Sequence, residues 1–144
     1  MQIAIIPARG GSKRIPRKNI KLFCGRPMIS WPIRAALESG LFDDVIVSTD
    51  DEEIAQTALA AGASAPFRRP DNLADDLSPA RGAINHAIAE AEKLHGRTAR
   101  TVCCIYAPSP LLEAADLTAA RTLLEARPGA WFVFAAAGYA HPVE

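Results

Sequence analysis

Along this chain of 144 residues, short apolar runs alternate with segments of helical periodicity, and this alternation limits the folds open to it. Runs rich in β-branched and apolar residues predict strands at 3–7, 45–49, 65–68, 101–106 and 130–137. Helical spacing and end signals predict helices at 28–39, from about 51 to 61, at 79–94 and at 115–126. Since parallel strands need a crossover, usually a helix, we expect one α/β domain, residues 1–144, with a mainly parallel sheet and right-handed crossovers.

Charge is unevenly distributed along the chain, although the formal net charge is zero. The first 37 residues contain eight of the sixteen Lys and Arg side chains and no Asp or Glu. Such local positive charge in a neutral chain favours a small anionic ligand over general nucleic-acid binding. Because no apolar run reaches the ~18 residues of a membrane span and the N-terminus lacks a signal-peptide pattern, we expect no membrane partner and a cytoplasmic location.

The positive charge is concentrated in the loop after the first predicted strand. This loop, residues 8–19, reads ARGGSKRIPRKN and contains five Lys or Arg. Gly10 and Gly11 are expected to turn with φ > 0, so that backbone N–H groups converge on an oxyanion while the cations neutralise a polyphosphate. The spacing excludes the GxxxxGK[ST] and GxGxxG loops. A solvated basic surface loop is the alternative, disfavoured by the preceding strand and the paired glycines.

Loops after the other predicted strands are expected to meet this basic loop. In open parallel sheets, ligands bind outside the carboxyl ends of the strands. Asp50 follows the second predicted strand, Arg69 the third, and residues 107–110 the fourth. We therefore expect one site at this edge of the sheet. Asp50 has a second interpretation, as the N-cap of the next helix, because Asp is a favoured N-cap residue.

The motif IIPARGGSKRIPRKN, residues 5–19, resembles the N-terminal signature of the acylneuraminate cytidylyltransferases, and most of all its pseudaminic acid branch. The resemblance continues through 25–29, 42–53, 67–70 and 102–106, so it covers most of the chain. It implies a three-layer, Rossmann-like nucleotidyltransferase fold of the nucleotide-diphospho-sugar transferase type. It also implies transfer of CMP from CTP to a nine-carbon nonulosonic acid, such as pseudaminic or sialic acid, with release of pyrophosphate. Mg²⁺ is the implied cofactor, its ligands unassigned, and a full-length relative is expected to be a homodimer.

The same resemblance implies which residues contact the substrates. Arg9 and Lys18 are expected to hold the phosphates and to act in catalysis, because charge spreads over the phosphoryl oxygens in the transition state. Ser12 and Asn19 are expected at the base or the phosphates, and Arg69 on the cytosine side. The complete expected set for the nucleotide is Ala8, Arg9, Gly10, Ser12, Lys13, Lys18, Asn19, Arg69 and Asp76, and for the sugar Tyr106 and Ser109.

Simpler roles remain open for several of these residues. Asn19 could cap a turn, and Arg69 could bind only Asp71 or Asp75 of its own loop. Arg14 and Arg17 are expected to be exposed charges without an essential part.

Two features depart from the family pattern. Residues 106–110 read YAPSP where the family has QPTSP or YPTAP, and each proline restricts the backbone of the residue before it, which affects the sugar side of the site. The chain is also shorter than family members, so we expect it to be the N-terminal part of a longer chain. The alternatives are a catalytically silent CTP-binding module and a related nucleotidyltransferase that activates another acidic sugar.

Overall fold

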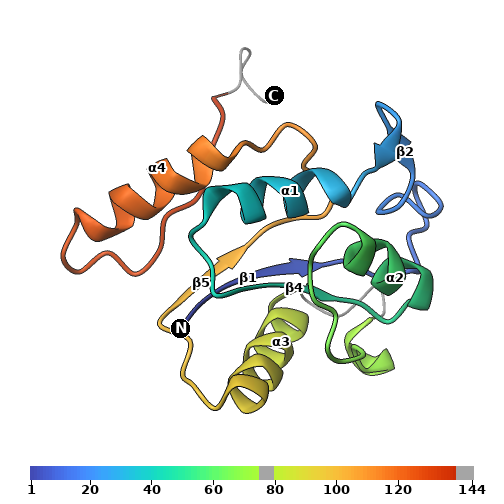
Figure 1. The fold of residues 1–144 in the computed structure, drawn as a ribbon, viewed down its shortest axis with the longest axis horizontal. Coiled ribbons are helices and arrows are strands. Elements are labelled where there is room, and N and C mark those ends of the chain that lie inside the picture. The colour runs from blue at the N-terminus through green and yellow to red at the C-terminus, as the bar shows by residue number, and fades with distance from the viewer. Residues whose placement is uncertain (75–79, 139–144) are drawn as a thin grey trace, which may run out of the picture.

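The computed structural model describes residues 1–74 and 80–138 (Figure 1). Its centre is a parallel sheet of three strands in the order β4-β1-β5, namely β1 Gln2–Pro7, β4 Asp44–Ser48 and β5 Thr101–Cys104. Ile5 in the central strand pairs with Ile46 on one side and with Cys104 on the other. The parallel sheet is thus confirmed, and the predicted strand 101–106 ends two residues early.

Helices cover both faces of this sheet, which makes the three layers expected for the fold. They are α1 Ser30–Ser39, α2 Glu52–Ala60, α3 Ala80–His95 and α4 Ala114–Glu125. In Figure 1, α1 and α4 lie together on one face and α3 lies on the other. None of the helices in the described ranges is long and apolar enough to cross a membrane.

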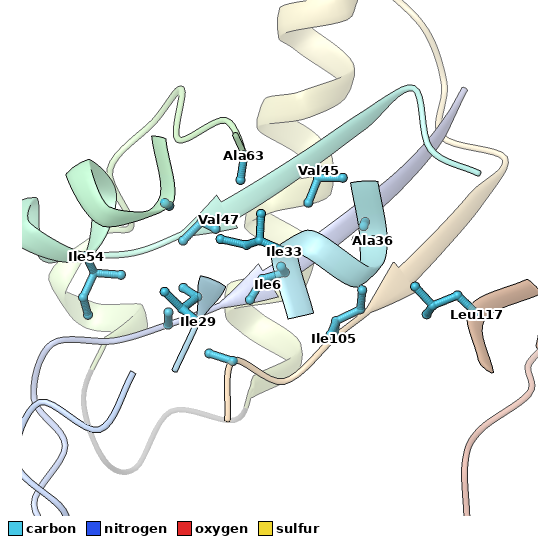
Figure 2. Close-up of a cluster of buried hydrophobic side chains, with 14 residues drawn as sticks. Ile6, Ile29, Ile33, Ala36, Val45, Val47, Ile54, Ala63, Ile105 and Leu117 are labelled. Atoms are coloured by element: carbon cyan, nitrogen blue, oxygen red, sulfur yellow. The ribbon is translucent and has the colours of Figure 1, made fainter. Parts of the chain in front are cut away.

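Alternate residues of β1 face opposite layers, so the strand is buried on both sides. Ala4 and Ile6 belong to a core cluster with Ile33 of α1, whereas Ile3 and Ile5 belong to a second cluster under α3. Figure 2 shows Ile6 and Ile33 together in the first cluster. Burial of each isoleucine side chain contributes about 1.5–3 kcal/mol. This continuous apolar run fixes the strand whose end carries the basic loop.

Both ends of helix α1 carry residues that suit their positions. Pro32 is the third residue of the helix, in the first turn, where its missing N–H costs no intrahelical hydrogen bond. Gly40 ends the helix with a left-handed φ of 63°, and its N–H donates to the carbonyl of Leu37 at 3.2 Å. The predicted helix end before Gly40 is therefore confirmed.

The predicted strand 65–68 is wrong as a regular strand. Only isolated parallel bridges remain there, between Ile46 and Ser64 and between Thr49 and Arg68. Pro66 has no backbone N–H to donate, so the ladder along β4 is interrupted between the two bridges. The segment still follows the edge of β4 and leads Arg69 to the carboxyl end of the sheet.

The predicted strand 130–137 is also wrong, since this segment is irregular in the structure. Trp131 is 94% exposed and Phe132 is 75% exposed. A β-strand exists only where a neighbour takes its backbone hydrogen bonds, and the three strands of the described sheet do not pair with this segment. Apolar composition alone therefore overestimated the sheet.

A small hairpin, β2 Leu22–Phe23 with β3 Arg26–Pro27, was not predicted. Its two-residue turn has Cys24 at φ 49° and Gly25 at φ 79°, the pair of positive values that type I′ turns require. The indole N–H of Trp31 donates to the carbonyl of Phe23 at 3.0 Å and ties the hairpin to α1. The Gly25 turn was its signal in the sequence.

Candidate functional site

The basic loop 8–19 and the residues after β4 meet at the carboxyl edge of the sheet, as expected. The N–H of Ala8 donates to the carbonyl of Ser48 at 3.0 Å, which extends the β1–β4 ladder into the loop. The next contact outward is between the N–H of Gly10 and Oδ1 of Asp50, at 3.0 Å. Parallel strand ends thus bring a loop rich in cations against a carboxylate 40 residues later in the chain.

Gly10 is needed for close approach, and the expected reason for the glycine pair was wrong. Neither Gly10 nor Gly11 has a positive φ. A Cβ at Gly10 would lie 2.7 Å from Oδ2 of Asp51 and 2.9 Å from its Cβ, whereas a Cβ at Gly11 would have no heavy atom within 4 Å. Because the N–H of Gly10 donates to Asp50, it is not directed at an external oxyanion in this conformation.

Asn19 closes the loop from its far end. The residue is 4% exposed, its Nδ2 donates to the carbonyl of Arg9 at 3.0 Å, and its own carbonyl accepts from the N–H of Ile29 at 2.8 Å. The bond to Arg9 spans ten residues, so Asn19 does more than cap a local turn. It joins the start and the end of the basic loop and connects both to the segment before α1.

Arg69 is a buried cation at the same edge. It is 4% exposed, its Nε donates to Oγ of Ser48 at 3.3 Å, and its Nη2 donates to the Ser48 carbonyl. Burial lowers the pKa of Arg69, while the charge of Asp50 raises it and that of Arg9 lowers it. The charges of Arg9 and Asp50 therefore both act on Arg69, although the three residues come from three separate loops. Among the described residues, the side chain of Arg69 is bonded to Ser48, whereas the sequence had suggested Asp71 as a possible partner.

The N-cap of α2 is Asp51, so the interpretation of Asp50 as the cap was wrong. The backbone of Asp51 is extended, and its Oδ1 accepts from the N–H of Ile54 at 3.0 Å. Asp50, one residue earlier, is left to accept from Gly10. In the STDD sequence at 48–51, either aspartate is chemically suited to the cap, and only the fold decides between them.

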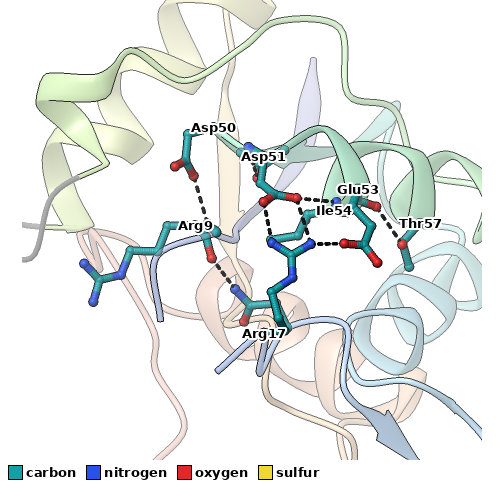
Figure 3. A network of polar contacts seen from close by, with 10 residues as sticks. Arg9, Arg17, Asp50, Asp51, Glu53, Ile54 and Thr57 are labelled. Atoms are coloured by element: carbon teal, nitrogen blue, oxygen red, sulfur yellow. Dashed lines mark hydrogen bonds and ion pairs between the residues drawn. The ribbon is translucent and has the colours of Figure 1, made fainter. Parts of the chain in front are cut away.

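Arg17 pairs with Asp51, the N-cap of α2, and with Glu53 in the first turn of that helix, so it is not the fully solvated charge that was expected (Figure 3). Its Nη1 lies 2.5 Å from Oδ2 of Asp51, its Nη2 lies 3.2 Å from Oδ1, and Nη2 also pairs with Glu53. The hydrogen bond to Asp51 is the main cause that raises the pKa of Arg17, and the same bond lowers the pKa of Asp51. These partners are more than 30 residues apart, so no local pattern predicted the contact.

The remaining expected residues differ in their placement. Ser12 and Lys18 are half-buried within the loop, Lys13 is exposed, and Ala8 is buried at the strand end. Tyr106, which is 62% exposed, and the half-buried Ser109 follow β5, on the opposite side of β1 from Arg69. Asp76 and Asp75 lie outside the described residues.

A cavity of about 190 Å³ adjoins this site beside the end of β4. Residues 49–52 form one wall and Phe67 and Arg68 contribute to the other. It is smaller than the roughly 300–1,000 Å³ of small-molecule sites, and its lining includes no residue of the loop 8–19. We therefore place the candidate anion site at the loop, with the cavity as its neighbour.

The described residues show no cluster of side chains to which the expected magnesium ion can be assigned. No three or more His, Cys, Asp or Glu side chains within residues 1–74 and 80–138 are grouped so that they could hold a metal. The carboxylates nearest the loop, Asp50 and Asp51, accept from Gly10 and from Arg17 and Ile54 respectively. The chemistry of this site is accordingly derived from the cations and the backbone of the loop.

Known proteins resemble this chain in sequence and in fold. A pseudaminic acid cytidylyltransferase of Campylobacter jejuni subsp. jejuni serotype O:2 is 46% identical over 142 residues, which are 99% of this chain and 60% of the relative. The N-acylneuraminate cytidylyltransferase A of Danio rerio is 46% identical over 121 residues, 84% of this chain and 27% of the relative. A solved CMP:2-keto-3-deoxy-manno-octonic acid synthetase complexed with CTP superimposes with a TM-score of 0.70 at 24% identity, covering 90% of this chain and 49% of that one.

The chain spans about 60% of the length of the Campylobacter relative. The solved structure shares the fold of this chain, which agrees with the expected nucleotidyltransferase architecture. The family model described as cytidylyltransferase matches residues 3–141, nearly the whole chain. The chain therefore belongs to the cytidylyltransferase family.

Proposed function

We propose that this chain binds CTP with the triphosphate on the basic loop 8–19 and serves the transfer of CMP to a nine-carbon acidic sugar, with release of pyrophosphate. The observation that carries the proposal is the loop itself: it is fixed at both ends by Asn19 and places five cations at the carboxyl edge of a parallel sheet. The names of the relatives, which act on pseudaminic acid and N-acylneuraminate, support the substrate class.

In the proposed reaction, a hydroxyl oxygen of the sugar attacks the α-phosphorus of CTP, and the bond from that phosphorus to the pyrophosphate oxygen breaks. Pyrophosphate leaves, and the hydroxyl proton is lost to solvent. Arg9 and Lys18 bind phosphate oxygens and stabilise the charge that develops on them. Lys13 and Ser12 are further proposed phosphate contacts. Asn19 acts by holding the loop closed, since its Nδ2 donates to the carbonyl of Arg9.

Arg69 is proposed to face the cytosine side of the nucleotide from its anchor on Ser48. Burying the charge of Arg69 costs less free energy because the carboxylate of Asp50 compensates that charge. Asp76 stays a proposed nucleotide contact outside the described residues, and Tyr106 and Ser109 stay proposed sugar contacts. The magnesium ion, the homodimer and the cytoplasmic location remain predictions, and no step of the reaction is assigned to the metal.

The test is an assay of pyrophosphate release by the whole chain with CTP and a panel of pseudaminic, sialic, legionaminic and eight-carbon acidic sugars. We expect release with at least one nine-carbon sugar. Calorimetry with CTP and UTP runs beside it, and we expect tighter binding of CTP, because hydrogen bonds made to the exocyclic amine are lost with its oxygen counterpart.

Each outcome points to one interpretation. CTP binding without turnover on any sugar would favour a silent CTP-binding module, and turnover only with the eight-carbon sugar would favour the related nucleotidyltransferase. Equal affinity for CTP and UTP would contradict the assignment of cytosine, and no binding of either nucleotide would contradict the proposal as a whole.

A further inference from the structure

Resting on the proposed function, we propose that Arg17 is a positioning residue that clamps the basic loop onto the first turn of α2 and so holds the phosphate-binding cations in place. The proposal concerns how the loop is held, and Arg17 itself makes no contact with the nucleotide in it.

The contact between Arg17 and Asp51 has the two-point geometry expected of a residue that fixes the loop. Both terminal nitrogens of Arg17 face the carboxylate of Asp51, at 2.5 and 3.2 Å, and Nη2 also reaches Glu53 (Figure 3). A planar guanidinium that meets a carboxylate with two parallel N–H groups fixes orientation as well as distance. Asp51 is itself fixed, because it accepts from the N–H of Ile54 as the N-cap of α2. The clamp therefore joins the loop to a rigid element.

The backbone at Arg17 gives an independent indication. Its φ of 54° is left-handed, a conformation uncommon for a residue with a side chain. Its carbonyl accepts from the N–H groups of both Ile20 and Lys21 at 3.0 Å, so the chain turns back directly after it. Such backbone strain persists where surrounding contacts hold it, and the ion pairs with α2 supply those contacts. The turn also sets the positions of Lys18 and Asn19.

Three attachments then hold the loop, each at a different point. Gly10 donates to Asp50, Asn19 donates to the Arg9 carbonyl, and Arg17 binds Asp51. The first two hold the start and the end of the loop, and Arg17 holds the stretch between them. Arg17 lies immediately before Lys18, so loss of its anchor is expected to release a proposed phosphate contact.

The charges distinguish a clamp from a direct phosphate contact. Asp51 and Glu53 would repel a nearby triphosphate, and in the structure Arg17 pairs with both. If Arg17 instead bound phosphate, it would have to leave these carboxylates, and removing Asp51 would free it to bind more tightly. The two roles therefore predict opposite effects of an uncharged residue at position 51.

The test is a double-mutant cycle on CTP affinity, measured by calorimetry on the whole chain with Arg17→Ala, Asp51→Asn and the double variant. Asn keeps the N-cap of α2 while it removes the charge, so the helix is preserved. We expect each single variant to weaken CTP binding about fivefold, the range of a partly exposed ion pair. The double variant should bind CTP no more weakly than Arg17→Ala does. Arg17→Lys should recover only part of the loss, because Lys lacks the fork.

Glu52→Gln is the matched control for charge alone. Its carboxylate lies on the same helical turn and accepts from Gln56 of that helix, so the variant removes one negative charge without touching the loop. We expect it to leave CTP affinity unchanged or slightly improved. Amide hydrogen exchange supplies a readout without nucleotide: Arg17→Ala and Asp51→Asn should both speed exchange in residues 12–21, while Glu52→Gln should not.

The outcomes separate this inference from the proposed function. If the parent chain does not bind CTP, the proposed function fails and the inference fails with it. If the parent binds CTP but Arg17→Ala binds equally well, or Asp51→Asn binds more tightly than Glu52→Gln, only the clamp is overturned. Additive losses in the double variant would likewise overturn it, because a shared contact cannot be lost twice.

Discussion

At position 10, the side chain of Asp51 occupies the space that a Cβ would need. A methyl group there would lie 2.7 Å from Oδ2 of Asp51, so Gly10→Ala must push the loop away from α2. We expect this variant to lower the free energy of unfolding by about 1–3 kcal/mol, the usual cost of overpacking. Urea denaturation measures it, with Gly11→Ala as the control, since a Cβ at Gly11 meets no heavy atom within 4 Å. Equal losses in both variants would contradict the role given to the close approach.

Arg9 and Lys18 carry the proposed phosphate contacts. Replacing either by Ala should weaken CTP binding by about 1.5–3 kcal/mol, roughly ten- to a hundredfold, if each makes a charge-assisted hydrogen bond. Calorimetry on the purified variants measures the loss. Arg14→Ala is the control, because Arg14 is an exposed cation of the same loop. If all three variants bind CTP like the parent, the basic loop is a solvated surface feature.

Single residues could be predicted from sequence where their chemistry was specific, and not where it depended on a distant partner. The meeting of Arg9, Asp50 and Arg69 at one edge followed from the expectation that the loops after parallel strands open onto the same edge, and it is confirmed. The positive φ expected of Gly10 and the solvated side chain expected of Arg17 were wrong, because the surroundings of both residues depend on Asp51, which is more than 30 residues away. Only the register of β1 against β4 brings that carboxylate to the loop.

At the scale of the element, Asp51 at the N-terminus of α2 both caps the helix and binds Arg17 of the loop. The bond from Arg17 and that from the N–H of Ile54 lower the pKa of Asp51 below its ordinary value of 3.8. A carboxylate with a lowered pKa stabilises the folded state above its unfolded pKa, and this contribution is lost as pH falls through the folded value. The effect should therefore be present at neutral pH and absent in strong acid.

The corresponding measurement compares parent and Asp51→Asn by urea denaturation between pH 7 and pH 2. We expect Asp51→Asn to be less stable by about 1 kcal/mol or less at neutral pH, and the difference to shrink as pH falls below the ordinary value of 3.8. Asn preserves the cap, so the difference reports the charge. A difference that is constant across the range, or that grows in acid, would contradict this account of Asp51.

Among the elements, helices were predicted more accurately than strands. The four predicted helices are present, because their apolar spacing and end residues are local signals. Segments 65–68 and 130–137 have strand-like composition, but a strand is defined by its neighbour. Pro66 interrupts the first, and the second pairs with none of the three strands of the described sheet. The hairpin at Gly25 is the converse case, since only its turn residue indicated it.

At the scale of the whole molecule, the parallel sheet places the proposed contacts among residues 1–74 and 80–138 along one edge. The loop 8–19 follows the central strand, and Arg69 and Tyr106 lie on opposite sides of it, beyond β4 and β5. The proposed function therefore puts the cytosine of CTP toward Arg69 and the sugar toward Tyr106. The opposite edge, where β5 begins after α3, has no part in the proposal. The proposed site for CTP is therefore a single location, at the carboxyl edge of the sheet.

The most direct test is to titrate CTP into the ¹⁵N-labelled chain and follow each backbone amide by NMR. We expect shift changes concentrated in residues 9–19 and at Asp50 and Arg69, with the amides near the start of β5 unmoved. Changes concentrated at Phe67 and Arg68 in the neighbouring cavity, or no changes at millimolar CTP, would contradict binding of CTP on the basic loop.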